Sequence, residues 1–158
     1  MYDRILVPLD GSKLGEAALP HVEGLVAKLS PGTKVEVTLL RVVSSLSHYI
    51  VAGGEAVQIP YTDKEIEQLK KDAADYLNKA GEGLRKKGAV VKIVVSAGRA
   101  AEEILKATDE IKADLVAMST HGRSGLSRWA FGSVADKVLR VGKTPILMVR
   151  ASEEAAKV

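Results

Sequence analysis

The sequence predicts an α/β fold in which a five-stranded parallel sheet is the middle layer of a three-layer α/β/α sandwich. Short apolar runs rich in valine, isoleucine and leucine recur along the chain at residues 4–9, 34–43, 89–96, 114–119 and 145–150. Most of these runs are continuous rather than alternating, which is typical of strands buried on both faces. The segments between them have a helical character. Alternating strands and helices imply parallel strands joined by right-handed crossovers, with helices on both faces of the sheet.

The first part of the chain supplies two strands and one helix. Residues 4–9 form the first strand, and apolar residues spaced three and four apart predict a helix over 12–29. Pro20 lies inside this helical pattern, so we expect a kink there, or a break followed by a restart. The second strand covers 34–43. Residues 44–61 follow no regular pattern, and a connection of this length favours a lid or a partner-binding surface.

The middle of the chain supplies the second helix and the third strand. A helix is predicted over 62–87 because Thr62 and Glu65 stand at the spacing of a capping box and Gly88 provides a stop. The strand at 89–96 follows directly.

The last part completes the alternation. A helix over about 99–112 precedes the strand at 114–119, a further helix follows Gly132, and the strand at 145–150 is the last of the sheet. The loop between the fourth strand and Gly132 is long for a simple turn.

Length and composition indicate one globular domain, which we assign to residues 1–150, followed by a frayed polar tail at 151–158. Hydrophobic residues make up 46% and charged residues 27% of the chain. Basic residues are scattered among acidic ones and aromatics are only 4%, so we expect no nucleic-acid partner. The sequence has no stretch as long as a membrane span, no signal-peptide pattern and no cysteine. We therefore expect a cytoplasmic protein with no membrane partner and no disulfide.

Two strand ends carry groups suited to ligand binding, which in open parallel sheets occurs where the topology switches direction. The first strand runs into Asp10, which could cap a helix, contact a ligand or approach a metal, and its position favours ligand contact. The fourth strand leads to a glycine-containing loop and a helix that begins at Gly132 and Ser133, where free N–H groups suit a phosphate. Ser133 and Asp136 also match a capping box, an interpretation that needs no ligand.

The sequence contains segments similar to known catalytic and metal-binding motifs, but their residue spacing does not match those motifs. The GKT at 142–144 is similar to the end of a Walker A loop, but the position that needs the earlier glycine is Lys137. The GRSG at 122–125 is one residue short of a nucleophile elbow. The histidines are isolated and lack metal-ligand spacing. The sequence therefore predicts no catalytic residue and no metal-ligating residue.

A spaced pattern of small residues covers the long loop. Ser119 and Gly122 are followed by residues 123–131 and then by Gly132-Ser133. The nucleotide-binding branch of the universal stress protein family has the pattern G-x-x-G, nine residues, then G-[S/T], so the spacing matches and serine replaces the first glycine. RILVPLDGS, LLRVV, SAGRAAEEIL and ADLVAMSTHGRSGLSR are also similar to segments of that family. The chain thus resembles a universal stress protein over nearly its whole length.

The resemblance implies a fold, a ligand and a set of binding residues. The fold is a Rossmann-like sheet of the adenine nucleotide alpha hydrolase-like type, with strand order 3-2-1-4-5. The ligand is ATP, with ADP or AMP as alternatives, together with Mg²⁺. The residues assigned to the nucleotide are Pro8, Leu9, Asp10, Val42, Met118, Ser119, Gly122, Arg123, Gly132, Ser133 and Val134. Pro8, Leu9 and Asp10 would border the adenine and ribose, and Val42 would line the adenine pocket. Met118, Ser119 and Gly122 would flank the ribose and phosphates, with Arg123 adding charge. The last three residues would hold the phosphates.

The implied function is that of an ATP-binding regulatory or sensor module in stress response, homodimeric through the strand at 145–150. Two alternatives stay open: a dimeric interaction protein of the same fold that binds no nucleotide, and a slow ATP hydrolase with Asp10 as its candidate base. We expect a binding protein rather than an enzyme. The departure at Ser119 either leaves the backbone path intact or crowds the ribose with a Cβ that glycine lacks.

Overall fold

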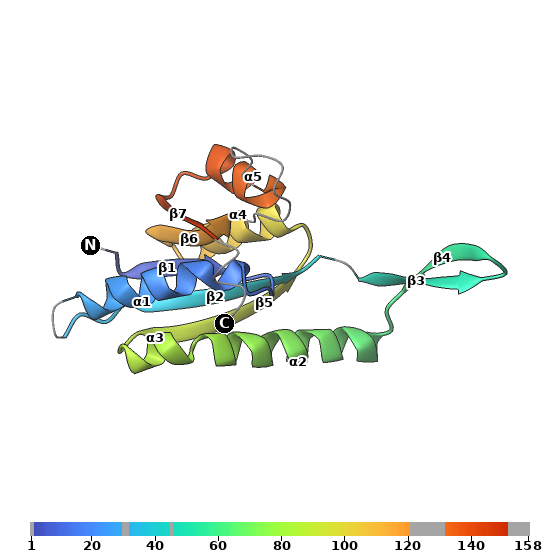
Figure 1. Cartoon of the computed structure of the whole chain (residues 1–158), viewed down its shortest axis with the longest axis horizontal. Helices are drawn as coiled ribbons and strands as arrows, with labels where there is room; N and C mark the ends of the chain where they lie inside the picture. Colours follow the sequence, from blue (N-terminus) through green and yellow to red (C-terminus); the bar gives the residue numbers. More distant parts are fainter. Residues whose placement is uncertain (1, 30–31, 45, 121–131, 152–158) are drawn as a thin grey trace.

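The computed structural model describes residues 2–29, 32–44, 46–120 and 132–151, and a five-stranded parallel sheet forms its middle layer (Figure 1). The strands, in the order in which they lie side by side, are β5 (Val90–Ala97), β2 (Glu36–Val43), β1 (Arg4–Pro8), β6 (Leu115–Thr120) and β7 (Ile146–Arg150). Numbered among themselves along the chain, these strands have the order 3-2-1-4-5. The predicted α/β class is confirmed, and the strand order is the one that the resemblance implies.

Helices cover both faces of the sheet and form the outer layers (Figure 1). The first face carries the 3-10 helix η1 (Gly15–Ala18), α1 (Leu19–Ala27), α2 (Asp63–Ala80) and α3 (Glu82–Lys86). The second face carries α4 (Ala100–Glu110) and α5 (Ser133–Val141). None of the helices in the described ranges combines the length and the hydropathy that crossing a membrane requires.

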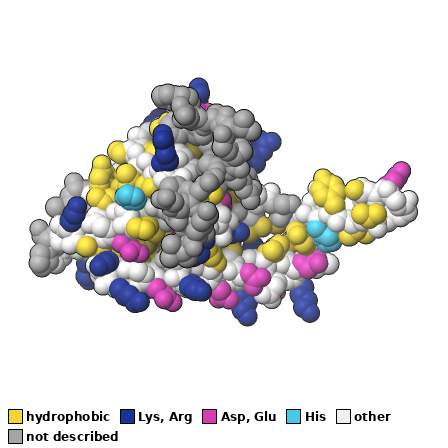
Figure 2. Space-filling model, viewed as in Figure 1, with side chains coloured by type: hydrophobic (Ala, Val, Ile, Leu, Met, Phe, Trp, Pro, Cys, Tyr) yellow, Lys and Arg dark blue, Asp and Glu magenta, His cyan; other side chains and the backbone are white. Residues whose placement is uncertain are grey.

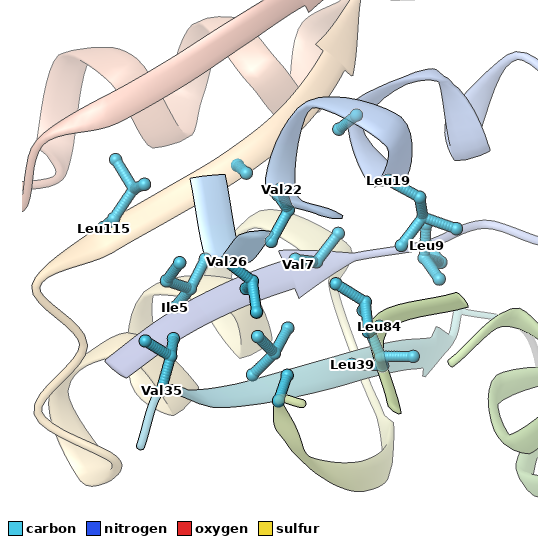
Figure 3. Packing of buried hydrophobic residues seen from close by; sticks show 14 of the residues in the cluster. Ile5, Val7, Leu9, Leu19, Val22, Val26, Val35, Leu39, Leu84 and Leu115 are labelled. Atoms are coloured by element: carbon cyan, nitrogen blue, oxygen red, sulfur yellow. The ribbon is translucent and has the colours of Figure 1, made fainter. Parts of the chain in front are cut away.

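The alternation of side chains along the strands divides the core between the two layers. On β1, Ile5 and Val7 pack into the cluster of the first face, whereas Leu6 packs into that of the second face. Figure 3 shows Val22 and Val26 of α1 directed toward the β1 residues of the first cluster. All five side chains are buried, and burial of such a side chain is worth about 1.5–3 kcal/mol. The apolar runs that predicted the strands therefore also hold the helix layers in place.

The helical segment predicted over 12–29 breaks at the proline. The 3-10 helix η1 ends at Ala18, and α1 begins at Leu19 with Pro20 in its first turn. A proline in the first turn removes no helical hydrogen bond, because the N–H groups there have no partner within the helix. The expectation of a break followed by a restart is confirmed.

The helix predicted over 62–87 starts as expected but is divided in two. Thr62 is the N-cap of α2: its Oγ1 accepts a hydrogen bond from the N–H of Glu65 at 3.3 Å, and Glu65 Oε2 accepts one from the N–H of Thr62 at 2.7 Å. The bond from the N–H of Thr62, followed by one that the Thr62 hydroxyl donates to the same carboxylate at 2.8 Å, lowers the pKa of Glu65. The chain turns at Gly81, where a Cβ would meet Val91 at 2.9 Å. Close approach of this glycine to the sheet therefore coincides with the end of the long helix.

Within 44–61, where the sequence shows no regular pattern, the structure has a hairpin. β3 (Ser47–Ala52) and β4 (Glu55–Pro60) pair antiparallel across the two-residue turn formed by Gly53 and Gly54. Both glycines have positive φ, 62° and 85°, as a type I′ turn requires. The hairpin extends away from the sandwich at the carboxyl end of β2 (Figure 1). The Gly-Gly pair between two apolar runs was the available signal for a hairpin in the sequence, and the prediction missed it.

Candidate functional site

A pocket of about 360 Å³ lies at the carboxyl ends of β1, β2 and β6 and at the N-termini of α4 and α5. Its size is typical of small-molecule sites. The chain leaves β1 toward the first face and leaves β6 toward α5 on the second face, so the pocket occupies the switch point of the sheet. The lining residues are Pro8, Leu9, Asp10, Gly15, Leu40, Val42, Ala100, Ile104, Met118, Ser119, Gly132, Ser133, Val134 and Ala135.

Every sequence-predicted binding residue in the described ranges borders this pocket. These residues are Pro8, Leu9, Asp10, Val42, Met118, Ser119, Gly132, Ser133 and Val134. The other two, Gly122 and Arg123, lie outside the described residues. Sequence reasoning missed the lining residues Gly15, Leu40, Ala100, Ile104 and Ala135. The apolar stripe of the helix predicted over 99–112 was the available signal for Ile104, but it indicates burial and not a pocket.

α5 presents to the pocket an N-terminus that no side chain of the described residues caps. Its N-cap is Gly132, and its first helical bond runs from the N–H of Asp136 to the carbonyl of Gly132 at 2.9 Å. The N–H groups of Ser133, Val134 and Ala135 therefore have no partner within the helix. These residues line the pocket, and the helix N-terminus carries partial positive charge. This side of the pocket suits an anion.

The capping box predicted at Ser133 and Asp136 is wrong. Ser133 is the first residue of α5 rather than its N-cap, which is Gly132, a residue without a side chain to cap the helix. The Asp136 carboxylate instead accepts hydrogen bonds from Nε of Arg140 at 2.9 Å, one turn along the helix. A Cβ at Gly132 would meet no described atom within 4 Å. None of the described residues therefore fills the space beside this glycine in front of α5.

The end of β1 is an ordered turn around Asp10. The Asp10 Oδ1 accepts hydrogen bonds from the N–H of Ser12 at 2.9 Å and from its hydroxyl at 2.6 Å. The Ser12 hydroxyl oxygen accepts one from the N–H of Gly15 at 3.0 Å. A Cβ at Gly15 would overlap the Asp10 carboxylate, which is exposed at the pocket. The N-cap of η1 is Leu14, so the helix-cap interpretation of Asp10 is wrong; the carboxylate orders the turn and faces the pocket, as ligand contact requires.

Ser119 joins the end of β6 to η1. Its hydroxyl accepts a hydrogen bond from the N–H of Ala18 and donates one to the carbonyl of Gly15, both at 3.0 Å. The residue is 6% exposed. Because the proton and one lone pair of the hydroxyl are engaged with the η1 backbone, serine has a structural role here that glycine could not perform.

The opposite wall of the pocket is apolar. Leu40 and Val42 come from β2, Met118 from β6 and Ile104 from α4, and all four belong to the cluster of the second face or pack against it. Apolar walls with a few placed polar groups are typical of sites for flat or aliphatic ligand moieties. The pocket therefore has an apolar side and an anion-binding side.

A cationic side chain supports the Asp10 turn from the first face. The Arg41 guanidinium lies 5.5 Å from the ring centre of Tyr76, and its Nη1 is buried with no hydrogen-bond partner among the described residues. A Cβ at Gly11, next to Asp10, would overlap this guanidinium. Burial, followed by the charge of Glu16, raises the pKa of Tyr76. Tyr76 is therefore neutral at physiological pH, and Arg41 packs directly behind the turn.

A family model described as the universal stress protein family matches residues 1–150. The chain belongs to the universal stress protein family. The universal stress protein MJ0577 of Methanocaldococcus jannaschii is 27% identical over 159 residues, which cover 95% of this chain and 96% of the relative. The universal stress protein YxiE of Bacillus subtilis is 28% identical over 152 residues, which cover 95% of this chain and 100% of the relative. The family expected from the spaced glycines is confirmed.

Solved structures of universal stress proteins share the fold. The MJ0577 structure has a TM-score of 0.72 at 26% identity and covers 97% of this chain and 99% of that chain. A universal stress protein in complex with cAMP has a TM-score of 0.66 at 20% identity, with 96% and 98% coverage. A family member from Arabidopsis thaliana with AMP bound has a TM-score of 0.62 at 13% identity, with 96% and 93% coverage. For the last two structures the likeness is one of fold.

Proposed function

We propose that this universal stress protein binds an adenine nucleotide, ATP first, in the pocket between β1, β6 and α5. We further propose that it acts in the cytoplasm as a homodimeric regulatory module in stress response. The observation that carries the proposal is the pairing, in one pocket, of an apolar wall with an uncapped helix N-terminus. Family members of the same fold with cAMP and AMP bound support the nucleotide class.

The chemistry of the pocket assigns one part of the nucleotide to each side. The base lies against the apolar side chains of Leu40 and Val42, and the phosphates face the N–H groups at the start of α5. The ribose lies between them, with its hydroxyl groups toward the exposed carboxylate of Asp10.

Magnitudes show that both sides of the pocket are needed. The helix N-terminus contributes ~0.3–1 kcal/mol, or up to ~2 kcal/mol when partly buried. Micromolar affinity needs ~8 kcal/mol. Burial of an aromatic ring of ~150–250 Å² contributes about 4–6 kcal/mol at ~25 cal/mol per Å². The base therefore supplies most of the affinity, and the N–H groups of α5 orient the phosphates and distinguish ATP from AMP.

Mg²⁺ would accompany the phosphates. No group of three or more His, Asp or Glu side chains in the described ranges could hold a metal ion by itself. Mg²⁺ in nucleotide sites keeps several waters and is held by one or two carboxylates together with phosphate oxygens. Asp10 is the carboxylate among the described lining residues, but in the proposed pose it faces the ribose, so Mg²⁺ would be held by phosphate oxygens and waters.

We propose binding rather than turnover because of the position of the same carboxylate. A general base must reach the proton that it removes. Asp10 Oδ1 accepts two hydrogen bonds from Ser12, and the described lining residues contain no histidine or lysine. ATP hydrolysis is therefore expected to be slow.

The proposed dimer forms through the outer edge of β7. The N–H of Val116 donates to the carbonyl of Pro145 at 2.9 Å, so the backbone carbonyl of Pro145 points toward β6. By the alternation of a parallel ladder, the N–H groups of Ile146 and Met148 face away from β6. This edge is available for a second copy, and pairing would cover it as exposed apolar edges require.

Isothermal titration with ATP, ADP and AMP in the presence of Mg²⁺ tests the site, and Gly132→Val is the decisive variant. A Cβ at Gly132 meets no described protein atom within 4 Å, so we expect a valine there to collide with the phosphates and not with the described part of the fold. We expect a loss of affinity of at least tenfold, with a stability change of about 1 kcal/mol or less from the altered N-cap. Gly24→Val is the matched control, since Gly24 lies in α1 and also has open space around it.

Two results would overturn the proposal. One is the absence of both binding heat and thermal shift at millimolar nucleotide. The other is equal affinity in Gly132→Val and Gly24→Val. Either result would favour the alternative of an interaction protein that binds no nucleotide.

A further inference from the structure

The hairpin of β3 and β4 projects from the sandwich, and we call residues 46–60 the arm. At its base the N–H of Tyr61 donates to the carbonyl of Leu46 at 2.9 Å, and the rings of His48 and Tyr61 lie 4.8 Å apart. Beyond this base the arm extends clear of the sheet and helices (Figure 1). An isolated two-stranded hairpin is marginally stable in water, and three or more strands or a covering helix are normally needed. The arm therefore lacks a covering element within the described chain.

Each face of the arm carries exposed apolar side chains. Cross-strand pairing places Ile50 opposite Val57 on one face and Val51 opposite Ala56 on the other. Val51 is 80% exposed and Tyr49 is 69% exposed. Figure 2 shows hydrophobic side chains spread along the arm, whereas charged side chains gather along the lower edge of the sandwich. This surface is unusual for a segment that stays in water as a single copy.

The edges of the arm lack the usual protection against strand pairing. Soluble proteins protect free edges with charged side chains, prolines, bulges or very short strands. Glu55 is the only charged residue of the arm, and it lies in β4 together with Pro60. β3 has neither a charged residue nor a proline. Its outer edge, a row of N–H and C=O groups, is therefore open to another strand.

We propose that β3 pairs antiparallel with β3 of a second copy of this chain, so that two arms form one four-stranded sheet. A second copy is the occupant that the arm fits, because a twofold axis through β3 brings together two identical, uncharged edges. The antiparallel arrangement also keeps the tips apart, and with them the two Glu55 carboxylates, over strands ~20 Å long at ~3.4 Å per residue. The four-stranded sheet has the number of strands that an independent β-structure requires.

The decisive experiment compares the mass of the full chain in solution with that of three variants, by analytical ultracentrifugation over a range of concentrations. In the first variant, Gly-Gly replaces residues 47–60; the hydrogen bond between Leu46 and Tyr61 shows that a short turn can join these ends. In the second, Val51→Lys places a charge on β3. In the third, Gln58→Lys places the same charge on the same face but on β4. Circular dichroism and thermal unfolding check that each variant is folded.

We expect the mass to fall by half in the deletion and in Val51→Lys, and to stay that of the full chain in Gln58→Lys. A full chain that is monomeric, or a deletion variant with the mass of the full chain, would overturn the proposal. An equal effect of both lysines would also contradict it, because it would indicate packing through the face rather than pairing through the β3 edge.

Disulfide trapping identifies the occupant. The chain has no cysteine, so a single cysteine introduced at any of positions 48–51 is the only thiol that can form a disulfide. Residues opposite each other in an antiparallel pair have Cα atoms ~4.5–5.5 Å apart, within disulfide range. Mild oxidation should yield covalent dimers at the position nearest the twofold axis and much less at its neighbours. A mass change in the deletion with no trapping along β3 would assign the arm to a different contact and refute the proposed pairing.

Discussion

Ser119 illustrates how one side chain can replace a family glycine and acquire a structural role. Its hydroxyl joins β6 to the backbone of Gly15 and Ala18, and the N–H of Ala18 that it satisfies is in a buried residue. Both partners are more than 100 residues away in the chain, with sequence separations of 104 and 101. The sequence showed that a serine stood at the position, but nothing local could indicate its partners.

We predict that Ser119→Ala destabilises the protein without abolishing nucleotide binding. The substitution removes two buried hydrogen bonds between β6 and η1, each worth about 0.5–1.5 kcal/mol, and the loss is measurable by urea unfolding. Ser119→Gly removes the same two hydrogen bonds and also the Cβ. If the Cβ leaves the ribose site intact, the two variants bind nucleotide equally. Binding at least tenfold tighter in Ser119→Gly than in Ser119→Ala would show that the Cβ crowds the ligand.

Local patterns at the residue scale were reliable at one helix start and misleading at another. Thr62 and Glu65 form the capping box that their spacing predicts. Ser133 and Asp136 have the corresponding spacing, but Gly132 is the N-cap of α5 and Asp136 pairs with Arg140. The motif does not encode which residue leaves the helical conformation, because a neighbouring glycine can take that position. The free N–H groups at this helix start were predicted beside the capping box, and with Gly132 as the N-cap they have no partner within the helix.

At the scale of elements, α4 and α5 form a pair whose N-termini both border the pocket. Lys137 on α5 donates a hydrogen bond to Glu102 Oε1 on α4 at 2.6 Å. This bond is the largest cause that lowers the pKa of Glu102 below its ordinary value of 4.5. A carboxyl group with a lowered pKa in the folded state stabilises the fold above its unfolded pKa, and that contribution is lost as the pH falls through the folded pKa.

Lys137→Gln should therefore lower the Tm near neutral pH, and the difference from the unsubstituted protein should shrink well below pH 4.5. Lys106→Gln is the control, because Lys106 and Glu110 are 3.9 Å apart, both exposed, and lie within α4 alone. Surface pairs of this kind contribute little, so the control should change the Tm less. A Tm difference for Lys137→Gln that is the same at both pH values would contradict the assignment.

The elements themselves were largely predictable, and the exceptions have physical reasons. Continuous apolar runs indicated all five strands of the sheet because strands buried on both faces have no polar alternation. The hairpin was missed because its exposed strands lie in a long connection without a buried face. The helix predicted over 62–87 divides at Gly81, which packs closely against Val91. Helical periodicity in the sequence does not reveal this contact, so it could not predict where the helix ends.

At the scale of the whole molecule, periodicity indicated layers but not the arrangement of strands within them. The order β5-β2-β1-β6-β7 depends on which strands exchange hydrogen bonds, and the resemblance supplied it. The pocket follows from this order because β1 and β6 become neighbours whose chains leave toward opposite faces. Asp10 and Gly132 could thus be predicted as members of one site only when the strand order was assumed. The apolar wall from α4 was missed for the same reason.

The two proposed contacts between copies make a joint prediction for the assembly. Pairing through β7 and pairing through the arm are both isologous, and two such contacts with perpendicular, intersecting axes close into a four-chain assembly. Met148→Pro removes an N–H on the outer edge of β7 without removing a hydrogen bond to β6. Met148→Ala is its control, because it loses the same side chain but keeps the N–H.

We expect Met148→Pro to halve the mass measured by analytical ultracentrifugation and Met148→Ala to retain it. Adding the Gly-Gly replacement of residues 47–60 to Met148→Pro should produce a folded monomer, since each change removes a different contact. A dimeric double variant would mean that a third surface joins the copies. A Met148→Pro variant with the mass of the full chain would show that β7 is not paired, and arm pairing alone would then produce a dimer.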